Sequence, residues 1–380
     1  MVKFYKLSFC VVVLFFGCKS KMRYTTTVAL KNLIIKYDTL FLKTNNFSGS
    51  GYFRVQDSNI LFFDTKFFLV NKYDLNGKFI NSYLGMGEGG NEIENFEFHF
   101  PLPNKVHGFF CSDYCFRLYD SNWHKISAPT MWKWAKQKKI YKDKDLSIIG
   151  KYFLNWDVSE LSTFWTPVDS HGNLYMPVNV NRKNSPEINK FEDPIKFYKN
   201  AKTVGKLNPY SGKLTAVGCF YPDYYNKNPY ISILSNNYID VRNDTIYVSY
   251  EADKYIYLYT KDFTFIRAFG YEGTDMKINY LQTRSAEEYY NPEVFTKVKK
   301  SFGYYTNIFA DPKSRFIFRS YTTGKPNISG LQLFNENVLE ADFTVPRKFC
   351  VVGSIDNFYY ADGLVNDSTL AIYRFKIIKK

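Results

Sequence analysis

Residues 59–84 read NILFFDTKFFLVNKYDLNGKFINSYL, and this stretch decides the fold class of the chain. Two apolar runs in it, 67–74 and 78–84, are short, rich in strand-forming residues and bounded by polar turn residues. Asn76 and Gly77 lie between these runs, and an Asn-Gly pair tolerates the positive φ angles of a tight hairpin turn. The stretch therefore predicts antiparallel strands joined by short turns.

Similar turn-centred hairpins recur along the chain. They lie at 116–126, 207–217, 256–269 and 331–343. Asp74 and Asp120 are 46 residues apart, and Tyr210 and Tyr259 are 49 apart. The 91 residues from Tyr119 to Tyr210 are close to two such periods. A period of about 40–50 residues with four strands per unit is typical of a β-propeller, here with about six blades.

The two ends of the chain are expected to meet in one blade. A last strand pair, 357–361 with 370–377, needs a further partner, and the early run LIIKYDTLFL at 33–42 can supply it. Pairing the first strand with the last removes an exposed sheet edge and closes the ring. We therefore expect residues 33–380 to form a single propeller domain, with a β-sandwich or a barrel as the alternative.

Two stretches interrupt the strand pattern, near 131–160 and 270–300. Both contain helix-like composition, and the second has a candidate helix cap at Ser285. We interpret them as excursions between strands and not as separate domains.

The N-terminal sequence MVKFYKLSFCVVVLFFGC indicates export. Lys3 and Lys6 precede an apolar run of ten residues, which is too short to span a bilayer and is typical of a cleaved signal peptide. Gly17 and Cys18 resemble the end of a bacterial lipobox, so residues 1–17 are expected to be removed and Cys18 to receive a lipid. Residues 18–32 would then form a tether. A plain signal peptide with an incidental cysteine is the alternative.

Charge and compartment together restrict the partners. The formal net charge is +14, and removal of residues 1–17 takes away two lysines and leaves +12. An exported chain rarely meets nucleic acid, so we expect no nucleic-acid partner. An anionic glycan or an envelope protein is the expected partner, besides the outer-membrane lipid that acylation of Cys18 would engage. The alternative is that the surplus basic side chains are dispersed over a solvated surface and bind no particular partner.

The remaining cysteines do not form a disulfide scaffold. Besides Cys10 and Cys18, the chain has only Cys111, Cys115, Cys219 and Cys350. Cys111 and Cys115 flank a short hairpin loop, so they could form a bridge in an oxidising periplasm. This lone C-x-x-x-C pair lacks the second ligand pair of a zinc site, and we expect no metal.

Two segments resemble a known family. YDLNGKFINSYLGMGEGGNEIENF at Tyr73–Phe96 and YYTNIFADPKSRFIFRSY at Tyr304–Tyr321 are similar to segments of the six-bladed β-propeller lipoproteins of Bacteroidetes, whose blades are related to NHL repeats. The resemblance implies a lipid-anchored protein of the cell envelope. The basic residues that follow Cys18 favour the periplasmic face of the outer membrane over the cell surface.

No catalytic motif stands out. The four histidines are scattered, and neither G-x-S-x-G nor H-E-x-x-H occurs, so we expect no catalytic residue and no cofactor. The candidate binding residues combine aromatic rings, which stack on sugars, with arginines, which grip carboxylate or phosphate. They are Trp132, Trp134, Tyr304, Tyr305, Arg315 and Arg319. Core packing of the tyrosines and solvation of the arginines is the alternative.

These features favour a non-enzymatic binding or scaffold protein that recognises a glycan, a peptide or a protein on one face of the propeller. Propellers offer a rigid platform with variable loops, which suits recognition. The alternative function is a hydrolase or lyase that acts on a carbohydrate or a lactone at the central channel.

Overall fold

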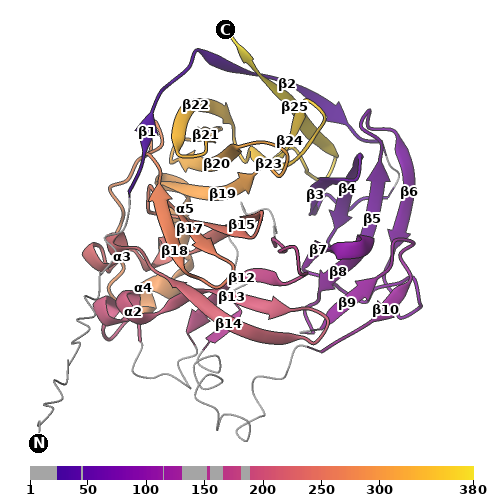
Figure 1. Cartoon of the computed structure of the whole chain (residues 1–380), viewed down its shortest axis with the longest axis horizontal. Coiled ribbons are helices and arrows are strands. Elements are labelled where there is room, and N and C mark those ends of the chain that lie inside the picture. The colour runs from indigo at the N-terminus through magenta and orange to yellow at the C-terminus, as the bar shows by residue number, and fades with distance from the viewer. Residues whose placement is uncertain (1–23, 44–45, 114, 131–151, 155–165, 181–188) are drawn as a thin grey trace, which may run out of the picture.

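The computed structural model describes residues 24–43, 46–113, 115–130, 152–154, 166–180 and 189–380. In these residues, six sheets form a ring around a central axis, each with four antiparallel strands, and one of them gains a short fifth strand at its outer edge (Figure 1). The protein is therefore a six-bladed β-propeller, as the hairpin period predicts, and neither a sandwich nor a barrel.

The blades follow one another along the chain. Blade 1 consists of β3 (Gly51–Gln56), β4 (Asn59–Asp64), β5 (Leu69–Tyr73) and β6 (Phe79–Leu84). Blade 2 consists of β7 (Phe98–Leu102), β8 (Val106–Phe110), β9 (Phe116–Tyr119) and β10 (Lys125–Ser127). Blade 3 consists of β11 (Tyr152–Leu154), β12 (Leu174–Val180), β13 (Lys202–Asn208) and β14 (Lys213–Phe220). Blade 4 consists of β15 (Asn237–Arg242), β16 (Thr245–Tyr250), β17 (Ile256–Thr260) and β18 (Phe265–Phe269). Blade 5 is β19 (Gly303–Ala310), β20 (Phe316–Thr323), β21 (Ile328–Asn335) and β22 (Val338–Pro346), and blade 6 is β23 (Cys350–Ile355), β24 (Phe358–Asp362), β25 (Ala371–Lys379) and β2 (Leu33–Phe41).

The predicted hairpins are the third and fourth strands of the blades. In blade 1 the turn between β5 and β6 places Gly77 at φ +80°, and the Asp74 amide donates to the Lys78 carbonyl at 3.0 Å. This is the Asn-Gly turn that the sequence predicts. The turn sets the register of the outer hairpin because its positive φ fits the twist of the two strands.

The two faces of the ring differ. Turns between the first and second and between the third and fourth strands lie on one face, which we call the turn face. The other connections lie on the opposite face, which we call the loop face, and they contain the helices. These are α2 (Pro194–Asn200), α3 (Asp223–Lys227), α4 (Ala286–Tyr290) and α5 (Pro292–Ser301), with the 3₁₀ turn η2 (Ser232–Leu234), whereas η1 (Pro103–Lys105) is a turn-face connection.

The predicted excursion near 270–300 contains α4 and α5, between β18 and β19. Ser285 caps α4, because its hydroxyl accepts a hydrogen bond from the Glu288 amide at 3.1 Å. Most of the excursion near 131–160 lies outside the described residues.

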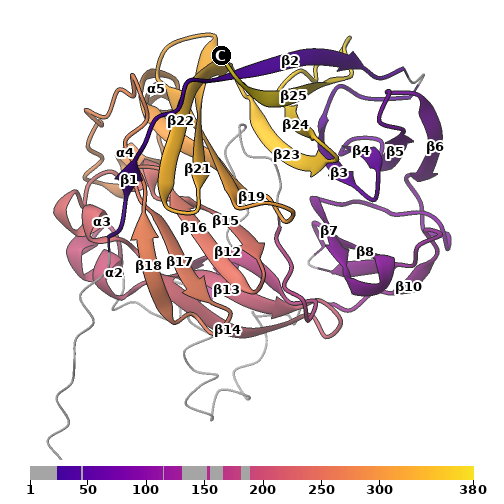
Figure 2. The same ribbon diagram turned by 45° about the horizontal axis from the view of Figure 1, so that its top comes forward.

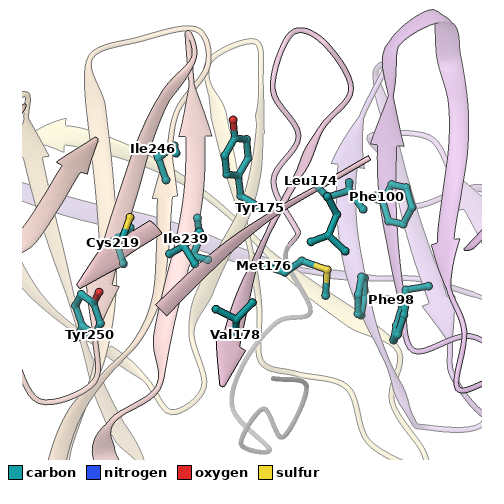
Figure 3. Packing of buried hydrophobic residues seen from close by; sticks show 14 of the residues in the cluster. Phe98, Phe100, Leu174, Tyr175, Met176, Val178, Cys219, Ile239, Ile246 and Tyr250 are labelled. Carbon is teal, nitrogen blue, oxygen red and sulfur yellow. The ribbon is translucent and has the colours of Figure 1, made fainter. Parts of the chain in front are cut away.

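Apolar side chains fill the space between neighbouring blades. Figure 3 shows such residues on three blades, with Phe98 on blade 2, Met176 on blade 3 and Ile239 on blade 4 among them. Each sheet is covered on both faces, so most residues of the inner strands are buried. All eight residues of β19 are buried. This explains why inner strands show near-continuous apolar runs instead of a simple alternation.

The ring closes as predicted. Strand β2 pairs with β25 over nine residues, from Leu33 opposite Lys379 to Phe41 opposite Ala371. The Leu42 amide then donates to the Leu370 carbonyl at 2.9 Å. An apolar cluster that contains Phe53 of blade 1 and Ile372 of blade 6 joins the first and last blades.

The residues before β2 form a strap along the ring, which we call the N-terminal strap (residues 24–32). Its short strand β1 (Thr27–Val28) pairs in parallel with the outer strand of blade 5, opposite Val338 and Leu339. Before that, the Thr25 amide donates to the Ala268 carbonyl of blade 4 at 3.1 Å. Figure 2 shows the strap crossing the outer edges of the blades and continuing into β2. These residues, placed in the tether by the sequence, are therefore fixed to the propeller.

Candidate functional site: a tyrosine-lined pocket on the loop face

The loop face carries a cavity of about 420 Å³ beside blades 4 and 5, which we call the tyrosine pocket. Its walls come from the N-terminal strap, from α3, from the β16–β17 connection, from the segment after β18 and from β19. Six tyrosines line it, namely Tyr24, Tyr224, Tyr255, Tyr257, Tyr280 and Tyr305. Its volume is in the range of sites for small molecules.

Charged side chains interrupt the aromatic walls. The carboxylates are Asp223, Asp253 and Glu272, and the ammonium groups are Lys227 and Lys254. The pocket is therefore close to charge balance, with one more acidic than basic group, although the chain as a whole is strongly basic. It presents flat apolar rings together with hydrogen-bond donors and acceptors.

A buried tyrosine fixes α3 against the β16–β17 connection. The Tyr225 hydroxyl donates to the Leu234 carbonyl at 2.7 Å and accepts from the Ala252 amide at 3.2 Å. Tyr224, the residue before it, is thereby held at the pocket wall. Burial raises the pKa of Tyr224 and of Tyr280, so both phenols stay protonated at neutral pH, and the Tyr280 hydroxyl donates to the Gly303 carbonyl at 3.0 Å.

Asp253 shapes the β16–β17 connection. Its carboxylate accepts from the Tyr257 hydroxyl at 2.7 Å and from the Tyr255 amide at 3.1 Å. Burial raises the pKa of Asp253, and the hydrogen bond from Tyr257 opposes that rise. These bonds hold the backbone that carries Tyr255 into the pocket wall.

Arg319 on β20 supports the same connection from beneath. It is fully buried, and its guanidinium donates to the carbonyls of Asp253 and Lys254. Its Nε also donates to the Ser249 hydroxyl at 2.8 Å. Burial lowers the pKa of Arg319, and the nearby Tyr305 and Asp253 oppose that shift. One side chain thus satisfies several backbone acceptors that the tight connection leaves without strand partners.

Tyr305 connects Arg319 to the second wall of the pocket. The Arg319 guanidinium lies 3.2 Å from the centroid of the Tyr305 ring, a cation–π contact. The Tyr305 hydroxyl donates to the Tyr271 carbonyl at 3.0 Å and accepts from the Gly273 amide at 3.2 Å. Burial raises the pKa of Tyr305 to about 12. Tyr305 and Arg319 therefore act mainly by positioning the two connections that form the pocket.

The other predicted binding residues lie elsewhere. Tyr304 is buried, and its ring contacts the Lys299 ammonium at 4.4 Å, which matches the packing alternative. Arg315 lies in the turn between β19 and β20, on the turn face, where its exposed side chain is 3.3 Å from Glu336. Trp132 and Trp134 lie outside the described residues.

Cys111 and Cys115 face each other across the β8–β9 loop, where the Cys111 amide donates to the Cys115 carbonyl at 2.9 Å. Both are free thiols in the structure. Their disulfide stays a prediction.

Sequence reasoning missed five of the six pocket tyrosines, namely Tyr24, Tyr224, Tyr255, Tyr257 and Tyr280. The clusters YPDYY at 221–225 and DKYIY at 253–257 contain three of them next to turn residues. With 33 tyrosines in the chain, this signal does not separate pocket residues from core residues.

A second cavity, of about 380 Å³, lies on the axis, where all six blades contribute residues to its lining. Two aspartates line this cavity, and their carboxylates accept hydrogen bonds from backbone amides. Asp240 accepts from the amides of Val241 and Ala310, at 2.8 and 2.7 Å. Asp169 accepts from the amides of His171 and Asn173, both at 2.9 Å. Within the residues that the structure describes, no group of three or more His, Cys, Asp or Glu side chains could hold a metal ion.

Fold and site together define the class of protein, a six-bladed β-propeller with a ligand-sized pocket on its loop face. No protein-family model and no curated protein matches the sequence. The chain is similar to the solved structure of a member of the DUF4221 family from Bacteroides vulgatus, with a TM-score of 0.66 and 10% identity over 93% of this chain and 100% of that one. It is also similar to a Bacteroides fragilis protein described as exported, with a TM-score of 0.52 and 14% identity over 94% of this chain and 98% of that one. At such identities the likeness shows the shared fold.

Among the described residues, no helix has the length and apolar character that crossing a membrane requires.

Proposed function

We propose that this chain is a non-enzymatic binding protein of the cell envelope and that it binds a sugar in the tyrosine pocket. One observation carries the proposal, namely that six tyrosines from five separate segments line a single cavity on the loop face. Sugar rings stack their C–H faces on aromatic side chains, and their hydroxyls pair with carboxylates, ammonium groups and phenols. In its wider form, the proposal is that the chain recognises a glycan, a peptide or a protein on the loop face.

The charges of the pocket favour an uncharged sugar. Three carboxylates and two ammonium groups leave no surplus of positive charge there. An anionic glycan would gain its attraction from the basic surface elsewhere, and salt would screen that attraction. Binding in the pocket should therefore resist salt.

Removing two rings from the pocket should abolish most of the binding. We expect Tyr224→Ala and Tyr255→Ala each to weaken binding by about tenfold, because a stacked ring contributes on the order of 1 kcal/mol. The measurement is a glycan array at low and high salt, followed by calorimetric titration of the strongest sugar. Tyr210→Ala is the matched control, since Tyr210 is half-exposed in the β13–β14 turn on the turn face. Unchanged affinity in the double variant would refute the site.

We also propose that a lipid on Cys18 anchors the chain at the periplasmic face of the outer membrane, as in the Bacteroidetes propeller lipoproteins that it resembles. The signal-like residues 1–17 and the Gly17–Cys18 pair support this proposal.

Substitution of Cys18 should remove the anchor. We expect Cys18→Ala to abolish incorporation of radiolabelled palmitate and to shift the protein from the membrane fraction to the periplasmic fraction. The parent chain, labelled in parallel, is the control. Persistent labelling of the variant would show that the lipid is attached elsewhere or that another signal holds the chain.

The alternative function, a hydrolase or lyase with its site at the central channel, stays a hypothesis. The tyrosine pocket lies away from the axis and favours recognition.

A further inference from the structure

We infer that the tyrosine pocket faces the membrane in which the chain is anchored, and that it binds the sugar headgroup of a glycolipid in that membrane. The inference rests on the proposed function and on the proposed lipid at Cys18. It goes beyond both because it names the source of the sugar.

The N-terminal strap connects the anchor directly to the pocket. Tyr24 lines the cavity, and its ring centroid is 4.7 Å from that of Tyr255. The next residues are fixed to blade 4, since the Thr26 hydroxyl donates to the Gly270 carbonyl and accepts from the Gly270 amide, both at 3.0 Å. The chain therefore enters the propeller at the wall of the pocket.

The distance from lipid to pocket is limited by chain length. Tyr24 is six residues after Cys18, and six residues span at most about 20 Å when fully extended. A tether of residues 18–32, as expected from the sequence, would span about 50 Å. Because the strap is fixed, the pocket must lie within about 20 Å of the membrane surface however residues 18–23 run.

The rim of the pocket suits a membrane surface. Tyr24 is 44% exposed, and the segment after β18 exposes Tyr271 by 50%, Ile278 by 40% and Leu281 by 37%. Lys254 and Lys277 are exposed in these segments, and so are Asp223, Glu272 and Asp275, so the rim carries both signs of charge, as the headgroups of a zwitterionic bilayer do. Exposed aromatic and aliphatic side chains, with lysines whose ammonium groups can reach the headgroups, suit a surface that lies at the headgroup level of a bilayer.

The first test measures orientation in the complete lipidated protein. An environment-sensitive fluorophore on Leu281→Cys, in a Cys115→Ser background, should shift to shorter wavelength and be quenched by spin-labelled lipid after reconstitution into phosphatidylethanolamine vesicles. The same fluorophore on Tyr210→Cys, on the turn face, should do neither. Equal signals at the two positions would overturn the membrane-facing orientation.

The second test separates the sources of the sugar. Residues 20–380, which lack the anchor, are added at high salt to phosphatidylcholine vesicles with or without an uncharged glycolipid that bears an oligosaccharide, and separately to the oligosaccharide released from that lipid. We expect binding to the sugar-bearing vesicles to exceed binding to the free oligosaccharide by about tenfold, and Tyr255→Ala to remove it.

Each other outcome of the second test is decisive. Equal binding to the free oligosaccharide would overturn the glycolipid assignment and leave the proposed function standing. Binding to neither form would overturn the glycolipid assignment, and the glycan array then decides whether the proposed function fails as well. Loss of palmitate labelling in the Cys18→Ala variant tests the anchor independently of both.

Discussion

Replacement of Arg319 by alanine is expected to lower the free energy of unfolding by about 4 kcal/mol and to abolish ligand binding at the tyrosine pocket. The guanidinium is fully buried and donates to the carbonyls of Asp253 and Lys254 and to Ser249. Alanine would leave these acceptors without a donor and would open a cavity beside the Tyr305 ring. Both effects act on the connection that carries Tyr255.

Urea unfolding followed by intrinsic fluorescence measures the loss of stability. Arg315→Ala is the matched control, because that side chain is exposed and its ion pair with Glu336 should contribute less than about 1 kcal/mol. If Arg319→Ala does not fold, Arg319→Lys should still fold and should lose about 2 kcal/mol, since lysine retains the charge but not the planar fork of donors. Equal stability of the Arg319 and Arg315 variants would contradict the positioning role.

Removal of the closing strand should have a still larger effect. A chain that begins at Lys43 lacks β2 and leaves the edge of β25 without a partner over nine residues. It also loses Leu42 from the cluster that joins blades 1 and 6. We expect a loss of at least about 5 kcal/mol, which is comparable to the whole stability of many domains, and therefore no cooperative thermal transition.

Two control chains distinguish ring closure from a general effect of truncation. A chain that begins at Asn32 retains β2 and should melt cooperatively. The second control moves β2 to the C-terminus. It consists of residues 43–380, a short Gly-Ser linker and residues 32–42, in that order. This order is feasible because the Lys380 amide already donates to the Asn32 carbonyl at 2.9 Å. Circular dichroism on heating should show that this permuted chain regains the transition, and failure to do so would refute closure as the cause.

The fold was predictable because its signals are local. The Asn76–Gly77 turn fixes one hairpin by backbone conformation alone, and the recurrence of similar hairpins every 40–50 residues implies identical units around a ring. Closure by 33–42 was also predictable, since the last strand pair needed a partner and only one apolar run remained near the other end.

The site depends on contacts between distant segments. Tyr305 and Arg319 were both among the candidate binding residues, and core packing was the alternative for the tyrosine. Neither their contact nor the burial of Arg319 was predicted, because a strand covered on both faces buries polar and apolar residues alike. Tyr24, Tyr224 and Tyr280 are separated by up to 256 residues and meet only after the ring has closed.

The sequence by itself determined the propeller, its closing strand and the signs of export, because turn conformation, strand period and a short apolar N-terminal run are properties of neighbouring residues. The tertiary structure decided which tyrosines share a cavity and that residues 24–32 lie against the blades. Both depend on the packing of whole sheets, since the strap is held by hydrogen bonds to Ala268 and Gly270, more than 240 residues further along the chain.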